Sequence, residues 1–498
     1  MKNATAAALA LSMLTGAGWA APHGPDAPAA PALQRSADPA GVLETLSSTG
    51  PVDHRNPFFQ VLGTNGRSCA TCHAPDQAFS LSAAGARRVF RQTRGRDPLF
   101  AAFDGGNCRN APVGDRASHS LILNYGLIRI ALPLPANAEF TVSVVHDPYG
   151  CAMTVDPQTG QTDIAVYRRP LPATNLSFLS AVMVDARETL APLNAGGSFL
   201  ANLETDLKHQ ALDATTGHAQ ASQPPTDAQL TAIVRFELGL YTAQGLDWRA
   251  GALSQGGAQG GAVPLAAQEY FPGINDSLGG NPTGSPFDPA AMTLFAAWDT
   301  GSDADAGTPR SGFRDAARRA IAAGERIFDT APLLITTVRG INDSAALGKP
   351  DTVVAHCSTC HDAPNVGDHS LPVPLDIGTS HSALSGTESD PRIAAGLAEL
   401  SAPDLPIYLI SGCVSPFNPG QPVSFYTSDP GRALITGKCS DVNRIKGPIL
   451  RGLAARAPYF HNGAAATLAQ VVSFYDKRFQ MGLTPQQEAD LAAFLGAL

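Results

Sequence analysis

The chain has 498 residues, and 34 Lys and Arg against 43 Asp and Glu give it a formal net charge of −9 at pH 7. An acidic chain is a poor ligand for nucleic acid or for an anionic membrane, so we expect neither as a partner. A hydrophobic content of 44% allows cores for two or three domains, whereas 48 Gly and 40 Pro predict many turns and irregular connections.

The first twenty residues have the pattern of a secretory signal peptide. Lys2 gives a basic start, residues 6–14 are mostly apolar, and residues 18–20 (Gly-Trp-Ala) offer a small-x-small cleavage site. The Pro- and Ala-rich residues 21–40 then predict a linker. Because no later run reaches the roughly 18 apolar residues that a membrane-spanning helix needs, we expect an exported periplasmic protein without a membrane span.

Two short runs of identical pattern organise the chain: residues 69–73 read Cys-Ala-Thr-Cys-His and residues 357–361 read Cys-Ser-Thr-Cys-His. In a C-x-x-C-H run each thiol can add to a haem vinyl group, and the imidazole that follows faces the iron. A redox pair, a disulfide or half of a zinc site gives no reason for His to follow both pairs. We therefore predict two covalently bound c-type haems, held by Cys69, Cys72, His73, Cys357, Cys360 and His361.

Predicted helices frame both haem motifs. Residues 41–48 are expected to form a short helix, and residues 315–328 carry apolar side chains at helical spacing. The chain ends in a helix with Thr484 as N-cap, Pro485 at its first position and Gln487 placed for a capping box. An opening helix, a motif on a turn and a closing helix is the order of a cytochrome c domain.

The sequence therefore predicts a mainly α fold with two cytochrome c-type haem domains and with loop-rich and small β insertions. Strand-like alternation in residues 140–145 marks one β insertion. Segments rich in Gly, Ser, Asn and Pro separate the two halves. The predicted parts are an N-terminal haem domain at 41–265, a Gly/Pro-rich connection at 266–310 and a C-terminal haem domain at 311–498.

Four cysteines remain after haem attachment: Cys108, Cys151, Cys413 and Cys439. Three pairings are possible, and an oxidising compartment permits each of them. Proximity in sequence favours Cys108 with Cys151 and Cys413 with Cys439. In the chain-entropy model, closing the second loop would stabilise the fold by roughly 3 to 4 kcal/mol. We interpret all four as structural and not as catalytic thiols.

A longer signature lies in the C-terminal half. Residues 446–453 read KGPILRGL and residues 457–463 read APYFHNG. They resemble the K-x-P-x-L-R … P-Y-F-H-D-G signature of the bacterial dihaem cytochrome c peroxidase and MauG superfamily. With both haem motifs, the resemblance covers most of the second predicted domain and parts of the first. It implies two haem domains that meet face to face, with a C-terminal haem that takes and stores electrons and an N-terminal haem that reacts with peroxide.

The resemblance also points to an axial ligand for the second iron. The peroxidase branch has a Met fourteen positions after the His of its P-Y-F-H segment, and here that position is Tyr475. MauG and its relatives place a ligating Tyr there. A phenolate favours the ferric and higher oxidation states and lowers the potential. The alternative is that Tyr475 packs in the core and Met481 ligates; we favour Tyr475 because Met481 lies beside Gly482 and outside the family's register.

Around the first haem the chain departs from the family's pattern. Residues 118–124 resemble a segment whose Asn helps to bind calcium between the haems, so Asn124 is a calcium candidate, with a buried structural role as the alternative. Residues 183–187 resemble the segment F-W-D-G-R, but Val184 occupies the position of the Trp that relays electrons. An aliphatic side chain cannot be oxidised at these potentials, so relay would need direct tunnelling or another aromatic residue.

Cleavage of peroxide needs a group that moves a proton from one oxygen to the other. The family has a distal Glu about ten residues after a Gln-Ala pair; Gln210 and Ala211 match the pair, but no carboxylate follows at that distance. His218 is our candidate for the proton transfer, with Gln210 beside it, and a surface His in a polar loop is the alternative. Three further histidines are unranked candidates: His119, His146 and His209.

Three functions fit these features. The first is a peroxidase-like dihaem oxidoreductase that passes electrons from the C-terminal to the N-terminal haem, which reduces hydrogen peroxide. The second is a MauG- or rubber-oxygenase-like enzyme that oxidises a protein or an organic substrate, and the third is a non-catalytic electron-transfer cytochrome. A small basic cytochrome or cupredoxin is the expected electron donor. Many members of the family are homodimers, and the sequence leaves the oligomeric state open.

Overall fold

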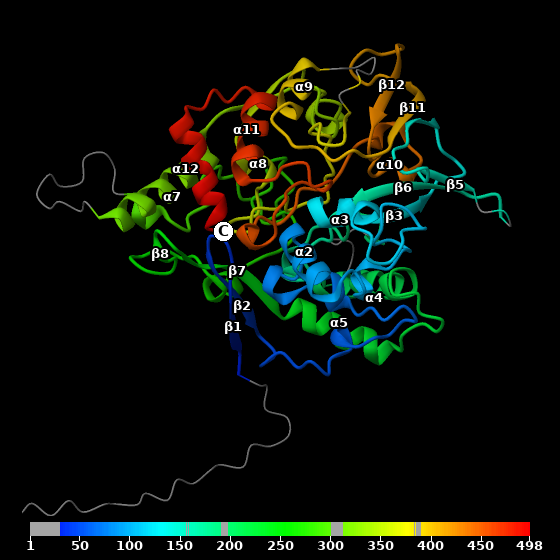
Figure 1. The fold of residues 1–498 in the computed structure, drawn as a ribbon. Coiled ribbons are helices and arrows are strands. Elements are labelled where there is room, and N and C mark those ends of the chain that lie inside the picture. Colours follow the sequence, from blue (N-terminus) through cyan, green and yellow to red (C-terminus); the bar gives the residue numbers. More distant parts are fainter. Residues whose placement is uncertain are drawn as a thin grey trace, which may run out of the picture.

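The computed structural model describes residues 30–155, 157, 159–190, 198–299, 312–382, 384 and 390–498 (Figure 1). The predicted signal peptide and about half of the predicted linker lie outside these ranges. Among the described helices, none combines the length and the apolar character that a membrane crossing requires.

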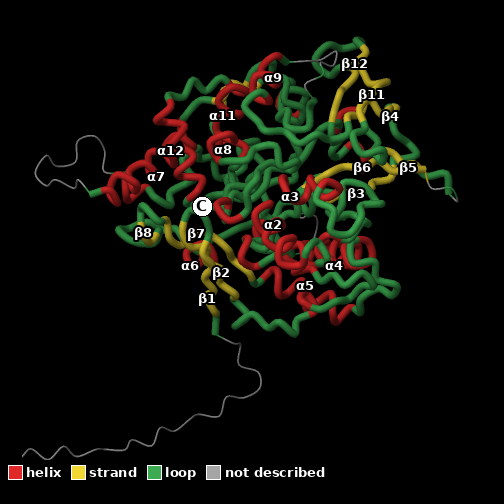
Figure 2. Tube along the Cα trace, in the orientation of Figure 1, coloured by secondary structure: helices red, strands yellow, loops and turns green. Residues whose placement is uncertain are grey.

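The expected small β insertions are present, but the content is mixed and not mainly α (Figure 2): 32% of the described residues are helical, short 3-10 helices included, and 17% lie in strands or bridges. The described helices are α1 (Cys69–Cys72), α2 (Ala83–Thr93), α3 (Ser120–Tyr125), α4 (Phe199–Gly217), α5 (Asp227–Leu238), α6 (Ala262–Ala266), α7 (Phe313–Thr330), α8 (Cys357–Cys360), α9 (Pro391–Leu397), α10 (Ala433–Thr436), α11 (Leu468–Phe479) and α12 (Pro485–Gly496).

The strands form four antiparallel sheets within the described residues, with the orders β1-β2-β7-β8, β3-β6-β5, β12-β11-β4 and β10-β9. Their bounds are β1 (Ala32–Ala37), β2 (Gly41–Ser47), β3 (Ile128–Pro133), β4 (Thr141–His146), β5 (Met153–Val155), β6 (Thr162–Arg168), β7 (Leu240–Asp247), β8 (Gly251–Ala252), β9 (Leu333–Ile335), β10 (Val353–Ala355), β11 (Ile407–Val414) and β12 (Pro422–Thr427). The strand predicted at 140–145 is confirmed as β4, and it pairs with β11 from the other half of the chain.

The helix expected at residues 41–48 is wrong, because this segment is the strand β2. Its side chains alternate between buried and half-buried positions, which is the period of a strand with one face on a core. The hydroxyl groups of Thr45 and Thr242 lie 2.9 Å apart across β2 and β7. Pairing on both edges, with β1 just before it in the chain and with β7 almost 200 residues away, therefore fixes the conformation of this segment.

Both of the other predicted helices are confirmed. The predicted helix at 315–328 lies within α7, and α12 begins with the expected capping box between Thr484 and Gln487. The two helices pack closely because α7 has Gly324 at the contact, where a Cβ atom would lie within 2.0 Å of the backbone oxygen of Asp490. The rings of Phe328 and Phe494 stack at 5.5 Å in the same core.

The disulfide pairing expected from sequence proximity is confirmed. One bond joins Cys108 to Cys151, and the other joins Cys413 in β11 to Cys439. Cys151 lies just before β5 and Cys413 lies within β11, so each disulfide bond anchors one of the small sheets.

A buried ion-pair network joins the two halves of the chain. Arg168, at the end of β6, donates to Asp185 and to both carboxylate oxygens of Asp429, at 2.6 and 2.8 Å. Burial by itself raises the pKa of a carboxyl group, but here the neighbouring Arg168 outweighs it and lowers the pKa of Asp185 to about 2. Arg168 thus bridges two buried carboxylates from distant segments, and Arg187 adds a second positive charge beside Asp185.

Replacing Arg168 by Met should lower the free energy of unfolding by about 3 to 5 kcal/mol, because the buried Asp429 loses its Arg partner and Asp185 keeps only Arg187. Urea unfolding followed by circular dichroism measures the loss. The matched control is Arg35→Met, which breaks the ion pair between Arg35 and Glu44. Because the Arg35 side chain is 64% exposed, this variant should lower the free energy of unfolding by less than about 1 kcal/mol. Equal losses in the two variants would contradict the assigned role of Arg168.

Candidate active site

The first C-x-x-C-H run forms a single helical turn at the wall of a cavity of about 1100 Å³. The backbone N–H of Ser68 donates to the hydroxyl of Thr71 and fixes the start of the turn. The Nδ1 atom of His73 lies 3.1 Å from the carbonyl oxygen of Phe79. An Nδ1–H donor to that carbonyl leaves Nε2 with a free lone pair for a metal.

The second run repeats this arrangement at a cavity of about 1460 Å³. The backbone N–H of His356 donates to the hydroxyl of Thr359, and Nδ1 of His361 lies 2.6 Å from the carbonyl oxygen of Gly367. Both cavities are lined mainly by apolar atoms, as small-molecule and cofactor sites usually are. The two motifs are thus equivalent in local geometry.

The four motif cysteines are not joined in disulfides. The pair Cys69 and Cys72 lines the first cavity, and the pair Cys357 and Cys360 lines the second. Burial raises the pKa of Cys69 to about 12 and that of Cys72 to about 11, so these sulfurs stay as thiols at neutral pH. Because the two pairs lie at different cavities, they do not form one four-cysteine zinc site.

Buried basic side chains with unpartnered nitrogen atoms line both cavities and fit a macrocycle that carries carboxylates. Nε of Arg169 has no hydrogen-bond partner, and Arg169 lines the wall of both cavities. In the second cavity, Nε of Arg456 and Nδ1 of His461 are also without partners. Burial lowers the pKa of Arg169 to about 9 because its charge is not compensated. The two propionate groups of a haem are the partners that such side chains lack, so the residues present fit the cofactor.

The structure separates the two candidates for the second axial ligand. Tyr475, on α11, lines the second cavity together with His361. Met481 is buried in an apolar cluster with Leu333 and Ile335, and it is not among the residues that line this cavity. The placement favours Tyr475, whose ligation stays a prediction.

A thin wall separates the two cavities, and Val184 lies in it. Four residues line both cavities: Arg169, Pro170, Leu171 and Val184. The carbonyl of Val184 accepts a hydrogen bond from the backbone N–H of Lys446, at 2.8 Å. Neither Trp248, which is exposed, nor Trp298, which is packed in a core under Arg318, lines either cavity. Among the described residues of this wall, no aromatic side chain replaces the expected Trp.

The candidates for proton transfer are brought together with the first motif. Gln210, on α4, and His218, directly after it, line the cavity that contains His73. Nδ1 of His218 lies 2.6 Å from a carboxylate oxygen of Asp104, whose other oxygen pairs with Arg67. Burial opposes ionisation of Asp104, but the hydrogen bond from His218 and the charge of Arg67 together hold its pKa below the ordinary value. The carboxylate therefore orients His218 with Nε2 free.

Sequence reasoning missed Asp104, Arg67 and Glu237. Glu237, on α5, lines the first cavity, and its Oε2 atom has no hydrogen-bond partner. Burial raises the pKa of Glu237 to about 8, so it is mostly protonated at neutral pH and can donate a proton. No spacing in the sequence connects it to the haem motif.

None of the three unranked histidines lines this cavity, but His209 directly precedes Gln210, which does. His119 is buried between the carbonyl oxygens of Asp115 and Phe100, and His146 pairs with Asp404 at the surface. Neither of them lines a cavity. Asn124 is exposed on α3 and lines neither cavity, so its alternative role as a buried structural residue is wrong.

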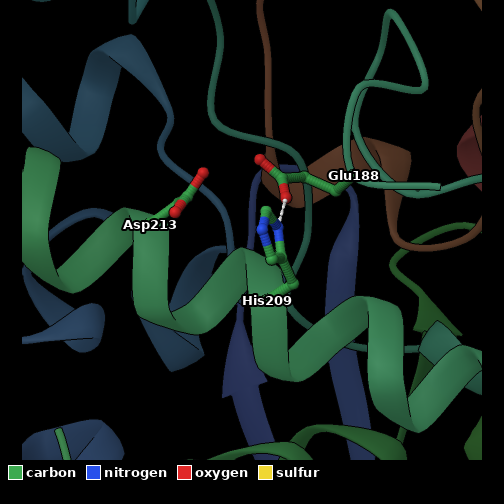
Figure 3. A group of neighbouring side chains, drawn as sticks. All are labelled: Glu188, His209 and Asp213. Atoms are coloured by element: carbon green, nitrogen blue, oxygen red, sulfur yellow. Dashed lines mark hydrogen bonds and ion pairs between the residues drawn. The ribbon is translucent and has the colours of Figure 1, made fainter. Parts of the chain in front are cut away.

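A side cavity of about 700 Å³ continues the first cavity outwards and shares Gln210 and His218 with it. Glu188 and Asp213 line the side cavity, and together with His209 they form a group of three ligand-type side chains (Figure 3). Figure 3 shows His209 and Asp213 on the same face of α4 and Glu188 above them, with a hydrogen bond of 2.6 Å from His209 to Glu188. This bond raises the pKa of His209.

Comparisons with known proteins give a local match. Two cytochrome-c peroxidases of Denitromonas iodatirespirans are 38% identical to the chain: IdrP1 over 81 residues and IdrP2 over 78 residues. The IdrP1 protein of Pseudomonas sp. (strain SCT) is 36% identical over 81 residues. These matches cover 14% of this chain and 21 to 22% of the relatives, so the chain spans about a fifth of their length. No protein-family model matches.

The crystal structure of a MauG-like protein associated with microbial copper homeostasis aligns with this chain. The alignment covers 89% of this chain and 87% of the chain in that structure. The two sequences are 13% identical and the TM-score is 0.31. A score this low does not establish a shared fold.

Proposed function

We propose that this protein is an exported, peroxidase-like dihaem c-type oxidoreductase, in which electrons enter at a C-terminal haem and leave at an N-terminal haem to hydrogen peroxide. The observation that carries the proposal is the repeated arrangement at the two cavities, each with two free thiols and an imidazole whose Nε2 is available. The local similarity to cytochrome-c peroxidases supports the same class of reaction.

Six residues would hold the two haems: Cys69, Cys72, His73, Cys357, Cys360 and His361. Bound haem would supply the reversible iron redox chemistry that side chains lack. Tyr475 would complete the coordination of the second iron, which suits a site that stores electrons or oxidising equivalents. The first cavity, with Gln210 and His218 on its wall, would leave room for peroxide.

His218 can move the proton that peroxide reduction requires. Its Nδ1–H is held by Asp104, so Nε2 can accept a proton from one peroxide oxygen and deliver it to the other. Reduction of one H₂O₂ to two waters then consumes two electrons and two further protons. With a net charge of −9, the chain would favour a small basic cytochrome or cupredoxin as the source of these electrons.

A second function is favoured by the wall between the cavities. Val184 cannot be oxidised, and the wall holds no Trp in its place among the described residues. Together with the phenol of Tyr475, this favours a MauG- or rubber-oxygenase-like reaction on a protein or an organic substrate. An exposed substrate would then reach the first cavity through the side cavity beside Glu188.

The mass of the mature protein, its optical and EPR spectra, and peroxide turnover test these proposals together. We expect a mass increase of two haems, one high-spin and one low-spin ferric signal, and turnover of peroxide with a reduced cytochrome. A colourless protein would contradict both functions. Two low-spin signals with no peroxide reaction would indicate an electron-transfer cytochrome.

Replacing Tyr475 by Met should raise the reduction potential of the second haem by on the order of 0.1 V or more, because a neutral thioether replaces an anionic phenolate. A spectroelectrochemical titration measures the shift. The matched control is Met481→Leu, which should leave the potential unchanged. A shift in the control and none in Tyr475→Met would reverse the ligand assignment.

A further inference from the structure

A second group of ligand-type side chains lies deep in the protein, beside the second haem motif. It consists of Asp276, Asp362 and His369, whose ligand atoms all lie within 4.8 Å of one another. The three residues are 1%, 0% and 4% exposed. All three are therefore buried, whereas the group in Figure 3 includes the exposed Asp213.

The carboxylates of this group are not compensated by a protein cation. Oδ1 of Asp276 has no hydrogen-bond partner, while its Oδ2 accepts from the backbone N–H of Gly280. Asp362 accepts from the backbone N–H groups of Ser370, at 2.6 Å, and Ser277, at 3.5 Å. Among the described residues, Nδ1 of His369 lies 3.4 Å from Asp362 and would form an ion pair only as a protonated imidazole, and Asp276 has no ion-pair partner. Two buried carboxylates without an Arg or Lys are costly unless a cation joins them.

We propose that Asp276, Asp362 and His369 bind one divalent transition-metal cation, with Zn²⁺ as the representative ion. Two carboxylate oxygens and one imidazole nitrogen are a donor set that such ions accept, and a fourth position is left for water or a backbone oxygen. The unpartnered Oδ1 of Asp276 is the atom that the ion would satisfy. The +2 charge of the metal ion would balance the charges of the two carboxylates.

The ion fastens a loop onto the second haem motif. Ser277 donates its hydroxyl to the carbonyl of Thr359, inside that motif, at 2.7 Å, and Asn275 donates to the carbonyl of Asp362, at 3.1 Å. Asp362 follows His361 directly in the chain, and His369 also lines the second cavity. The metal therefore holds both sides of the turn that carries His361. The site does not depend on the proposed reaction, because its ligands are present whether or not peroxide is the substrate.

The first test is the metal content of the purified holoprotein, measured by inductively coupled plasma mass spectrometry. We expect one equivalent of a divalent transition metal beyond the haem iron. After removal with a chelator, the melting temperature should fall, and Zn²⁺ should restore it while Ca²⁺ does not. A protein without a stoichiometric ion that also fails to bind added Zn²⁺, or one restored by Ca²⁺ alone, would overturn the proposal.

Variants locate the ion. Asp276→Asn should lose it while keeping two covalent haems, and the control Asp213→Asn, which alters the exposed group in Figure 3, should retain it. Loss of the ion in Asp213→Asn and retention in Asp276→Asn would assign it to the exposed group instead. If Asp276→Asn fails to fold, titration of the chelated wild-type protein with Zn²⁺ still decides whether a buried site exists.

Discussion

A variant with Ser in place of both Cys357 and Cys360 should carry one covalent haem instead of two. Thioether bonds need both sulfurs at the turn of α8, and a serine hydroxyl does not form them under the same maturation. The second cavity, of about 1460 Å³, would then lose the group that fills it and compensates Arg456, so we also expect a large fall in the melting temperature. The mass of the intact protein measures the haem count.

The double variant at the first haem motif is the control for the loss of the second haem. Replacing Cys69 and Cys72 by Ser should remove the other haem and keep the low-spin spectrum assigned to the second site. If either double variant retained two covalent haems, the attachment residues would be wrong. If both lost both haems, the two sites would mature as a unit.

Replacing His218 by Ala should lower kcat/KM for hydrogen peroxide about 10²- to 10⁴-fold, the usual contribution of one positioned proton-transfer group. Both haems should remain attached, because His218 is not an attachment residue, and added imidazole should restore part of the rate. Steady-state turnover with a reduced cytochrome measures the change.

Two further variants distinguish His218 from its neighbours. His209→Ala, at the exposed group of the side cavity, should change the rate by only a few-fold. Glu237→Gln replaces the other proton donor of the first cavity. A wild-type rate in His218→Ala combined with a large loss in Glu237→Gln would transfer the proton-transfer role to Glu237.

The parts of the structure that sequence predicts well are those set by nearby residues. The capping box of Thr484 and Gln487 and the alternation that gives β4 each depend on fewer than ten positions. The disulfide between Cys413 and Cys439 closes a separation of 26 residues. In each case the signal that permits the prediction lies within a short stretch of sequence, even where, as for β4, the pairing partner is distant.

The failures have distant causes. Residues 41–47 form a strand that pairs with the adjacent β1 on one edge and with β7, far along the chain, on the other, and seven residues are too few to distinguish such a strand from a short helix by periodicity alone. The bond that orients His218 comes from Asp104, at a separation of 114 residues. Glu237 became a candidate only because folding buries it without a hydrogen-bond partner for one oxygen. Such residues are recognisable by burial and by unpaired atoms, which a sequence does not contain.

The pairing of β4 with β11 bears on how this protein can be divided. A fragment that begins near residue 311 would keep β11 but lose β4, and the freed edge would present unpaired N–H and C=O groups from Ile407 to Ser411. Open edges of this kind recruit strands from other chains and promote aggregation. Expression of either half alone should therefore give self-associating material, and studies of a single haem are better made by removing one pair of motif cysteines from the full-length chain.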